Sequence, residues 1–119
     1  MIYRVYIEPP TLDDIDTAYL WIRRVSLRAA DEWLDGLGDA IDSLARMPAS
    51  HALAPEAAAF GCDIHEMHYG RYPQVYRVFF VIRKRKVHVL HVRHAAQRPL
   101  AKGQVKEMHS MPLSKRQKK

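Results

Sequence analysis

The spacing of the apolar residues changes once along the chain, and this change most constrains the fold. Between residues 15 and 44 apolar side chains recur at every third or fourth position, which is the repeat of an amphipathic helix. Between residues 64 and 93 they form short runs rich in β-branched and aromatic residues, which are typical of strands. Residues 2–7 have the same strand character, and Pro9-Pro10 ends them. We therefore expect one strand, a helical region and then further strands.

The helical region is expected to contain two helices. Thr11 is followed three residues later by Asp14, which resembles a capping box at the start of the first helix. Ser26 is the predicted N-cap of the second helix, which should stop near Pro48. So short a joint predicts an αα-hairpin. The predicted apolar stripes are Ile15, Ala18, Tyr19, Ile22 and Val25 on the first helix, and Leu27, Ala30, Leu34, Leu37, Ile41 and Leu44 on the second.

The second half is expected to form a strand meander. Residues 48–62 suggest a surface loop with one helical turn at 55–59. Three strands follow, at residues 64–69, 75–82 and 87–93, separated by turns at 70–74 and 83–86. The fold class is therefore α+β, in the order β-α-α-β-β-β, with an antiparallel sheet and the N-terminal helical hairpin packed on one face.

The charge is divided unevenly between the two halves. Residues 1–63 hold 5 Lys/Arg and 11 Asp/Glu, whereas residues 64–119 hold 14 Lys/Arg and 2 Asp/Glu. A basic half suits a polyanion, either nucleic acid or an acidic protein. The alternative is a solvated charge run with a basic tail, because residues 100–119 alone supply 6 of the 14 basic residues.

Length and composition limit the classes of protein. With 119 residues and 48% hydrophobic content, one packed domain is expected over residues 1–99, followed by a basic, partly disordered tail over 100–119. The single cysteine, Cys62, cannot form an internal disulfide, which fits a reducing cytosol. We see no signal peptide and no apolar stretch long enough for a membrane span, so a cytoplasmic protein without a membrane partner is expected. No metal-ligand spacing or Gly-rich phosphate loop indicates a cofactor.

Several short segments, taken in order, resemble the RelE/ParE superfamily of type II toxins, also called plasmid stabilisation proteins, across about residues 2–100. The segments are Asp13-Asp14-Ile15, Ala29-Ala30-Asp31-Glu32-Trp33-Leu34, Pro48, Pro55-Glu56, Tyr69-Gly70, Tyr76-Arg77-Val78-Phe79-Phe80 and Val87-His88-Val89-Leu90-His91-Val92-Arg93-His94. The resemblance implies a growth-inhibiting toxin that a cognate antitoxin neutralises, with oligomers formed through the antitoxin complex.

The resemblance leaves the target open. RelE-type members cleave mRNA on the ribosome, and ParE-type members poison DNA gyrase, so one fold serves two function classes. If the chain is an enzyme, it should be a metal-independent, ribosome-dependent endoribonuclease. The alternative to both is an inactive toxin-like remnant that only binds an antitoxin.

Metal-free RNA cleavage needs a cation for the phosphate, a base and an acid. Arg77 is the candidate phosphate ligand, because it shares a strand face with Phe79 and Val81 in an otherwise apolar run; the alternative is a structural arginine paired with Glu66. His94 resembles the strand-end histidine of the family and has a titration range that suits proton transfer. Glu56 resembles an acidic loop residue that serves some nuclease members as a base.

The candidate binding residues show where the chain departs from the family pattern. They are Arg93, Arg98, Glu66 and His68. Nuclease members carry lysines on the strand that here holds Glu66 and His68. The family's common ending has an arginine where this chain has Gln97, although Arg98 follows one place later. The missing lysines weaken the nuclease interpretation. Gln97 favours the inactive remnant, unless Arg98 substitutes for the arginine.

Two spatial expectations follow. If the last two strands form a hairpin centred on residues 83–86, position 77 pairs near position 92, and Arg77 and His94 should form one patch at one end of the sheet, with Pro55-Glu56 folding over it. The surplus of aromatic residues on the helical hairpin, namely Trp21, Trp33 and Tyr19, predicts an exposed apolar groove for an antitoxin segment.

Overall fold

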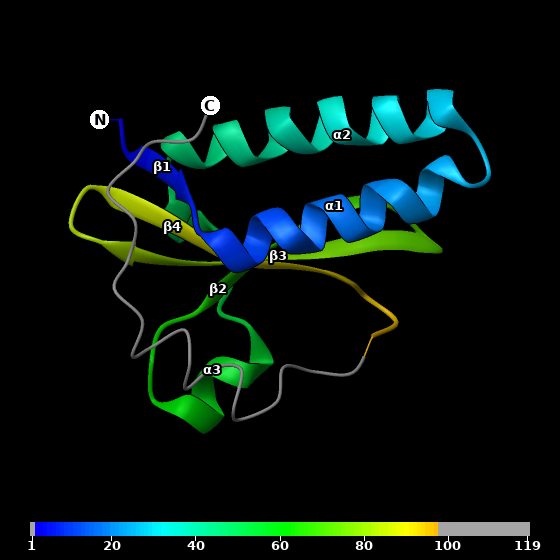
Figure 1. Cartoon of the computed structure of the whole chain (residues 1–119). Coiled ribbons are helices and arrows are strands. Elements are labelled where there is room, and N and C mark those ends of the chain that lie inside the picture. Colours follow the sequence, from blue (N-terminus) through cyan, green and yellow to red (C-terminus); the bar gives the residue numbers. More distant parts are fainter. Residues whose placement is uncertain (1, 98–119) are drawn as a thin grey trace.

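The computed structural model describes residues 2–97, and its elements follow the predicted order (Figure 1). The elements are β1 (Arg4–Ile7), α1 (Pro9–Arg23), α2 (Leu27–Asp42), α3 (Pro55–Phe60), β2 (His65–Arg71), β3 (Gln74–Arg83) and β4 (Lys86–His94). Two 3-10 turns, Ser43–Ala45 and Pro48–Ser50, lie between α2 and α3. The single helical turn expected in the loop is α3, which extends to Phe60.

The four strands form one sheet in the order β1-β4-β3-β2. The pairs β2–β3 and β3–β4 are antiparallel, as predicted. The first strand, however, pairs with β4 in parallel, so the sheet is mixed and the expectation of a wholly antiparallel sheet is corrected at this edge. Short turns reveal which neighbouring strands form hairpins, whereas no local pattern specifies the direction of a strand whose partner lies at the other end of the chain.

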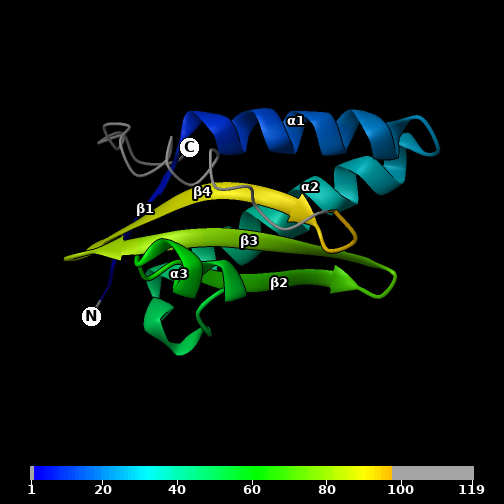
Figure 2. The same ribbon diagram turned by 90° about the horizontal axis from the view of Figure 1, so that it is seen from below.

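The helical hairpin covers one face of the sheet and α3 covers the other (Figures 1 and 2). On the hairpin face, Leu37 and Ile41 of α2 pack against buried strand residues such as Val78 and Phe80. The opposite face has a smaller core, made of Ala54, Ala57, Ile64, Phe79, Val81 and Leu90. Leu90 reaches this face through a bulge in β4, where the register passes from Phe79↔His91 to Phe80↔Val89.

The start of α1 differs from the expectation, because strand β4 engages the residues that were to form a cap. The Thr11 hydroxyl donates to the carbonyl oxygen of Val89 at 2.8 Å, and Asp14 accepts from the amide of Val92 at 2.9 Å. The predicted capping box is therefore wrong, and Pro9-Pro10 open the helix, where a missing N–H costs nothing. At α2 the prediction is confirmed, since the Ser26 hydroxyl accepts from the Ala29 amide at 3.1 Å.

The apolar stripes are only partly buried. Ala30, Leu37, Ile41 and Leu44 lie in the interior as predicted. Near the bend, Val25 and Leu27 are exposed, because the bend of the hairpin extends past the end of the sheet (Figures 1 and 2). Leu34, one turn further along α2, is also on the exposed side. Of the helices described, none has the length and apolar character that a membrane span requires.

Candidate functional site

Arg77 lies at the centre of a cluster of charged side chains under α3. It points to the α3 face with Phe79 and Val81, as the alternation along β3 predicts. Its guanidinium binds Glu56 in a bidentate manner, with N···O distances of 2.8 and 3.1 Å, and its Nε donates to Glu66 at 2.8 Å. The arginine side chain is 14% exposed and that of Glu56 is 6% exposed. We call Arg77, Glu56, Glu66 and His68 the Arg77 cluster.

The charge of Arg77 is maintained by its partners. Burial opposes a charged guanidinium, but the hydrogen bonds and negative charges of Glu56 and Glu66 outweigh burial and raise the pKa of Arg77. Its planar face also lies over the Phe79 ring, 4.5 Å from the centroid. The predicted alternative of pairing with Glu66 is therefore present, and Glu56 adds a second carboxylate.

The remaining members of the cluster come from α3 and β2. Glu56 stands in the first turn of α3, so the Pro55-Glu56 segment folds over the sheet as expected. Glu66 and His68 share the same face of β2, and the His68 ring is 2.8 Å from a Glu66 oxygen. Arg93 is opposite Arg77 in the strand ladder and is half-buried. Arg98 lies outside the residues that the structure describes.

His94 does not join the Arg77 cluster. Arg77 pairs with Arg93 and Tyr76 pairs with His94, so the register differs by one place from the expected pairing near residue 92. Because successive side chains along a strand point to opposite faces, His94 lies on the hairpin face, edge-on to Tyr76 at 5.1 Å. The expectation that Arg77 and His94 form one patch is corrected: they are close along the strands but separated by the sheet.

Both ring nitrogens of His94 are engaged. The Ala96 amide can only donate, so Nδ1 accepts from it at 3.0 Å. The other nitrogen, Nε2, is 3.1 Å from the Gln74 side-chain oxygen and must carry the proton of that contact. Gln97 completes the turn by accepting from the His94 amide at 2.6 Å. The His94 ring therefore joins the end of β4 to Gln74 of β3 and to the following turn.

A groove of about 760 Å³ lies on the hairpin face, between α1 and the ends of β3 and β4. Its lining includes Asp14, Ala18 and Trp21 of α1 and Arg24 directly after that helix, with Tyr76 and His94 of the sheet. Trp21 is 66% exposed, as expected of a groove residue. The other two aromatic residues are otherwise engaged: Trp33 packs edge-on against Tyr69 and Tyr76, and the Tyr19 hydroxyl donates to Asp31 at 2.6 Å.

Two histidine–carboxylate pairs attach the start of α1 to β4, and no sequence pattern predicts them. His88 is buried against Glu8 at 2.8 Å and stacks on Tyr6. His91 is 2.6 Å from Asp14. No periodic pattern links residues so far apart. The only signal in the sequence is two histidines within an apolar strand, and it does not identify their partners.

The comparisons with known proteins agree on one family. The family model described as the ParE toxin of the type II toxin–antitoxin system parDE matches residues 5–99. A solved structure titled as the chromosomal ParDE toxin–antitoxin system from P. aeruginosa has a TM-score of 0.62, with 12% sequence identity, and the match covers 78% of this chain and 96% of that one. At this identity the likeness concerns the fold. No curated protein sequence matches the chain.

Proposed function

From the premise that this chain belongs to the ParE toxin family of type II toxin–antitoxin systems, we propose that it arrests growth by binding DNA gyrase and not by cutting mRNA. The proposal is supported most by the Arg77 cluster. A phosphate ligand needs an accessible guanidinium, yet that of Arg77 is mostly buried and already binds two carboxylates. An RNA phosphate would have to displace both Glu56 and Glu66, which repel it.

The position of His94 supports the same interpretation. A metal-free nuclease needs its proton-transfer group within reach of the phosphate that its cation holds. Here the sheet separates His94 from Arg77. One nitrogen of the His94 ring contacts the turn after β4, and the other contacts Gln74 at the start of β3. A toxin that acts by protein contact requires no such assembly, because its effect depends on surface shape and charge.

We assign the groove beside α1 to the cognate antitoxin. Its apolar lining, which includes Ala18 and Trp21, suits the apolar face of an amphipathic helix. Two charged residues of the lining, Asp14 and Arg24, can fix the orientation of that helix. We expect the antitoxin to neutralise the toxin by occupying this groove.

The target is tested by inducing the toxin and measuring two outcomes in the same cells. We expect double-strand DNA breaks trapped on gyrase, and no in-frame cuts in ribosome-bound mRNA. A His94→Ala variant should keep this activity, because a toxin that acts by protein contact needs no proton-transfer group. In-frame mRNA cleavage that the His94→Ala change removes would establish the nuclease instead. Antitoxin binding with neither outcome would identify an inactive remnant.

The antitoxin site is tested with two substitutions on the same helix. Ala18→Arg fills the groove, whereas Leu12→Arg adds the same charge at an exposed position outside it. We expect Ala18→Arg to weaken the antitoxin at least tenfold by calorimetry and Leu12→Arg to leave its affinity unchanged. Equal affinities for the two variants would place the antitoxin elsewhere.

A further inference from the structure

The basic residues of the helical hairpin are confined to its bend. Over residues 9–42 the chain carries eight acidic residues and three basic ones, and the three are Arg23, Arg24 and Arg28. The acidic residues nearest to them are engaged, since Asp31 accepts from Tyr19 and Glu32 pairs with Arg28 at 3.2 Å. An exposed pair of this kind contributes little, so Arg28 can exchange Glu32 for another anion.

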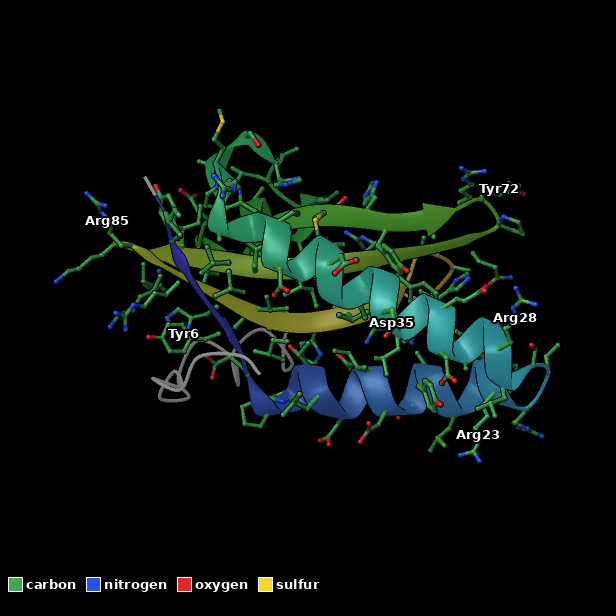
Figure 3. The ribbon with its side chains drawn as sticks, turned by 90° about the horizontal axis from the view of Figure 1, so that it is seen from above. Tyr6, Arg23, Arg28, Asp35, Tyr72 and Arg85 are labelled. Atoms are coloured by element: carbon green, nitrogen blue, oxygen red, sulfur yellow. The ribbon has the colours of Figure 1, made fainter. Side chains whose placement is uncertain are left out.

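A second segment adds to this end of the molecule. The turn between β2 and β3 places Tyr72 at the same end as Arg23 and Arg28 (Figure 3). The groove connects the two segments, because Trp21 of α1, Arg24 directly after that helix and Gln74 of β3 line it together. We define the tip surface as Trp21, Arg23, Arg24, Arg28, Arg71 and Tyr72.

The tip surface presents two aromatic rings to solvent among four arginines. Tyr72 is 91% exposed, and Trp21 is 66% exposed although the Arg24 guanidinium lies 5.2 Å from its ring centroid. Exposing such rings is unfavourable in water, and no buried partner of the described chain explains them. Arginines that bind phosphates, with aromatic rings on which bases stack, form the usual surface for nucleic acid with unpaired bases.

We propose that the tip surface binds a DNA strand with unpaired bases, with the arginines on the phosphates and Trp21 and Tyr72 stacked on bases. The choice of DNA rests on the proposed function, since gyrase opens DNA and the toxin would meet such a strand there. Because Trp21 and Arg24 also line the groove assigned to the antitoxin, antitoxin and DNA compete for the free toxin.

A matched control stands at the opposite end of the molecule. The turn between β3 and β4 carries four exposed basic residues and no aromatic residue. The four are Arg83, Lys84, Arg85 and Lys86. Arg85 lies at the far end of the sheet from Tyr72 (Figure 3). Attraction by charge alone would use this turn at least as well as the tip surface, whereas stacking can only use the tip surface.

The experiment follows the fluorescence of Trp21 in the full-length chain. A Trp33→Phe background leaves Trp21 as the only tryptophan, because the chain has two. The probe is a single-stranded oligothymidylate of about 12 nucleotides, within the site sizes typical of such surfaces. We expect saturable quenching. The slope of log binding constant against log salt concentration should become shallower by about 0.7 for each of Arg24→Gln and Arg28→Gln.

The variants decide the outcome. By anisotropy of a labelled oligothymidylate, Trp21→Ala and Tyr72→Ala should each weaken binding on the order of tenfold, the effect of losing one stacked base. The double variant Arg83→Gln/Arg85→Gln should change the affinity for the oligothymidylate less than threefold. Binding that the turn variant weakens most, or that Trp21→Ala leaves unchanged, would overturn the proposal. Equal quenching by polyglutamate would also overturn it, because that result indicates an acidic protein partner. Tighter binding of an oligouridylate of the same length would overturn it in favour of RNA. The binding experiment contains no gyrase, so its failure does not contradict the gyrase proposal, which has its own test.

Discussion

The two faces of the sheet are held to their covering helices by different means. On the hairpin face, α2 is held mainly by buried apolar residues such as Leu37 and Ile41, and the Tyr69 hydroxyl donates to the Trp33 carbonyl oxygen at 2.8 Å. On the other face, α3 has six residues and a small core, and Glu56 joins it to the sheet through Arg77. A helix too short to bury much apolar surface is thus fixed by directional, charged hydrogen bonds.

The difference has a consequence for how each face responds to substitution. Apolar stabilisation is spread over many contacts. A substitution there lowers the free energy of unfolding in proportion to the apolar area lost, and further if a charge is buried. A buried ion cluster is different, because removing one partner leaves the others uncompensated, while replacing the whole cluster by apolar residues can be neutral. The predictions below test this distinction.

The largest effect is expected for a charge placed in the hairpin core. Ile41 is 1% exposed, and Ile41→Asp buries a carboxylate without a partner at a cost of several kcal/mol, comparable to the whole stability of a small domain. We expect no cooperative melting transition by circular dichroism. Leu34→Asp, on the more exposed side of the same helix, is the control and should still melt cooperatively. An unchanged melting temperature for Ile41→Asp would refute this description of the core.

The Arg77→Ala variant should lose about 3–5 kcal/mol of unfolding free energy, because the two carboxylates then lose the guanidinium that binds both. Urea denaturation measures the loss. The triple variant Arg77→Met/Glu56→Leu/Glu66→Leu is the sharper half of the test, because we expect it to recover most of that stability. If the triple variant is as unstable as Arg77→Ala, the two faces do not differ in the way described.

A smaller effect belongs to the joint of the hairpin. The Ser26 hydroxyl caps α2 through the Ala29 amide, and Ser26→Ala should cost about 1 kcal/mol of unfolding free energy. Ser26→Asp restores an acceptor at the helix N-terminus and serves as the control. The loss should be visible in the midpoint of urea unfolding, and a midpoint unaffected by Ser26→Ala would mean that the cap contributes nothing.

The smallest effect at neutral pH is expected for Tyr76 on the hairpin face. Burial raises the pKa of Tyr76 above its ordinary value of 10.0. The folded state thus holds the phenolic proton more tightly than the unfolded state. This contribution is complete below pH 10.0 and is lost as the pH rises through the raised value. Tyr76→Phe should flatten the alkaline fall in stability, and Tyr72→Phe, at an exposed ring, should not. Identical alkaline profiles for the two variants would contradict the burial of Tyr76.

Most of the fold was predictable because local patterns determine it. The change from helical to alternating periodicity gave the order of the elements, and Ser26 gave the boundary between the helices. The pairing of β1 with β4 was not predictable in direction, because it depends on how the whole chain returns. The false capping box has the same origin, since Thr11 and Asp14 bond to a strand that is remote in sequence.

The candidate site was predictable in its parts more than in its assembly. Arg77, Glu56 and Glu66 were each singled out, and the structure brings them together. His94 was assigned to the same patch by counting residues along two strands. The count from the turn is correct as far as Phe80↔Val89. The bulge at Leu90, which no sequence signal marks, then shifts the register by one place and moves His94 to the other face of the sheet.

The place of β4 between β1 and β3 also affects how the protein is made. The first strand has its only described strand partner in β4, which is the last of the described strands to leave the ribosome. At synthesis rates of roughly 5–20 residues per second, on the order of ten seconds pass between the appearance of β1 and that of β4. During this interval the N-terminal strand and the first turn of α1 lack the partners that hold them, including Val89 for Thr11. A nascent chain of this topology therefore completes its sheet only after β4 has been translated.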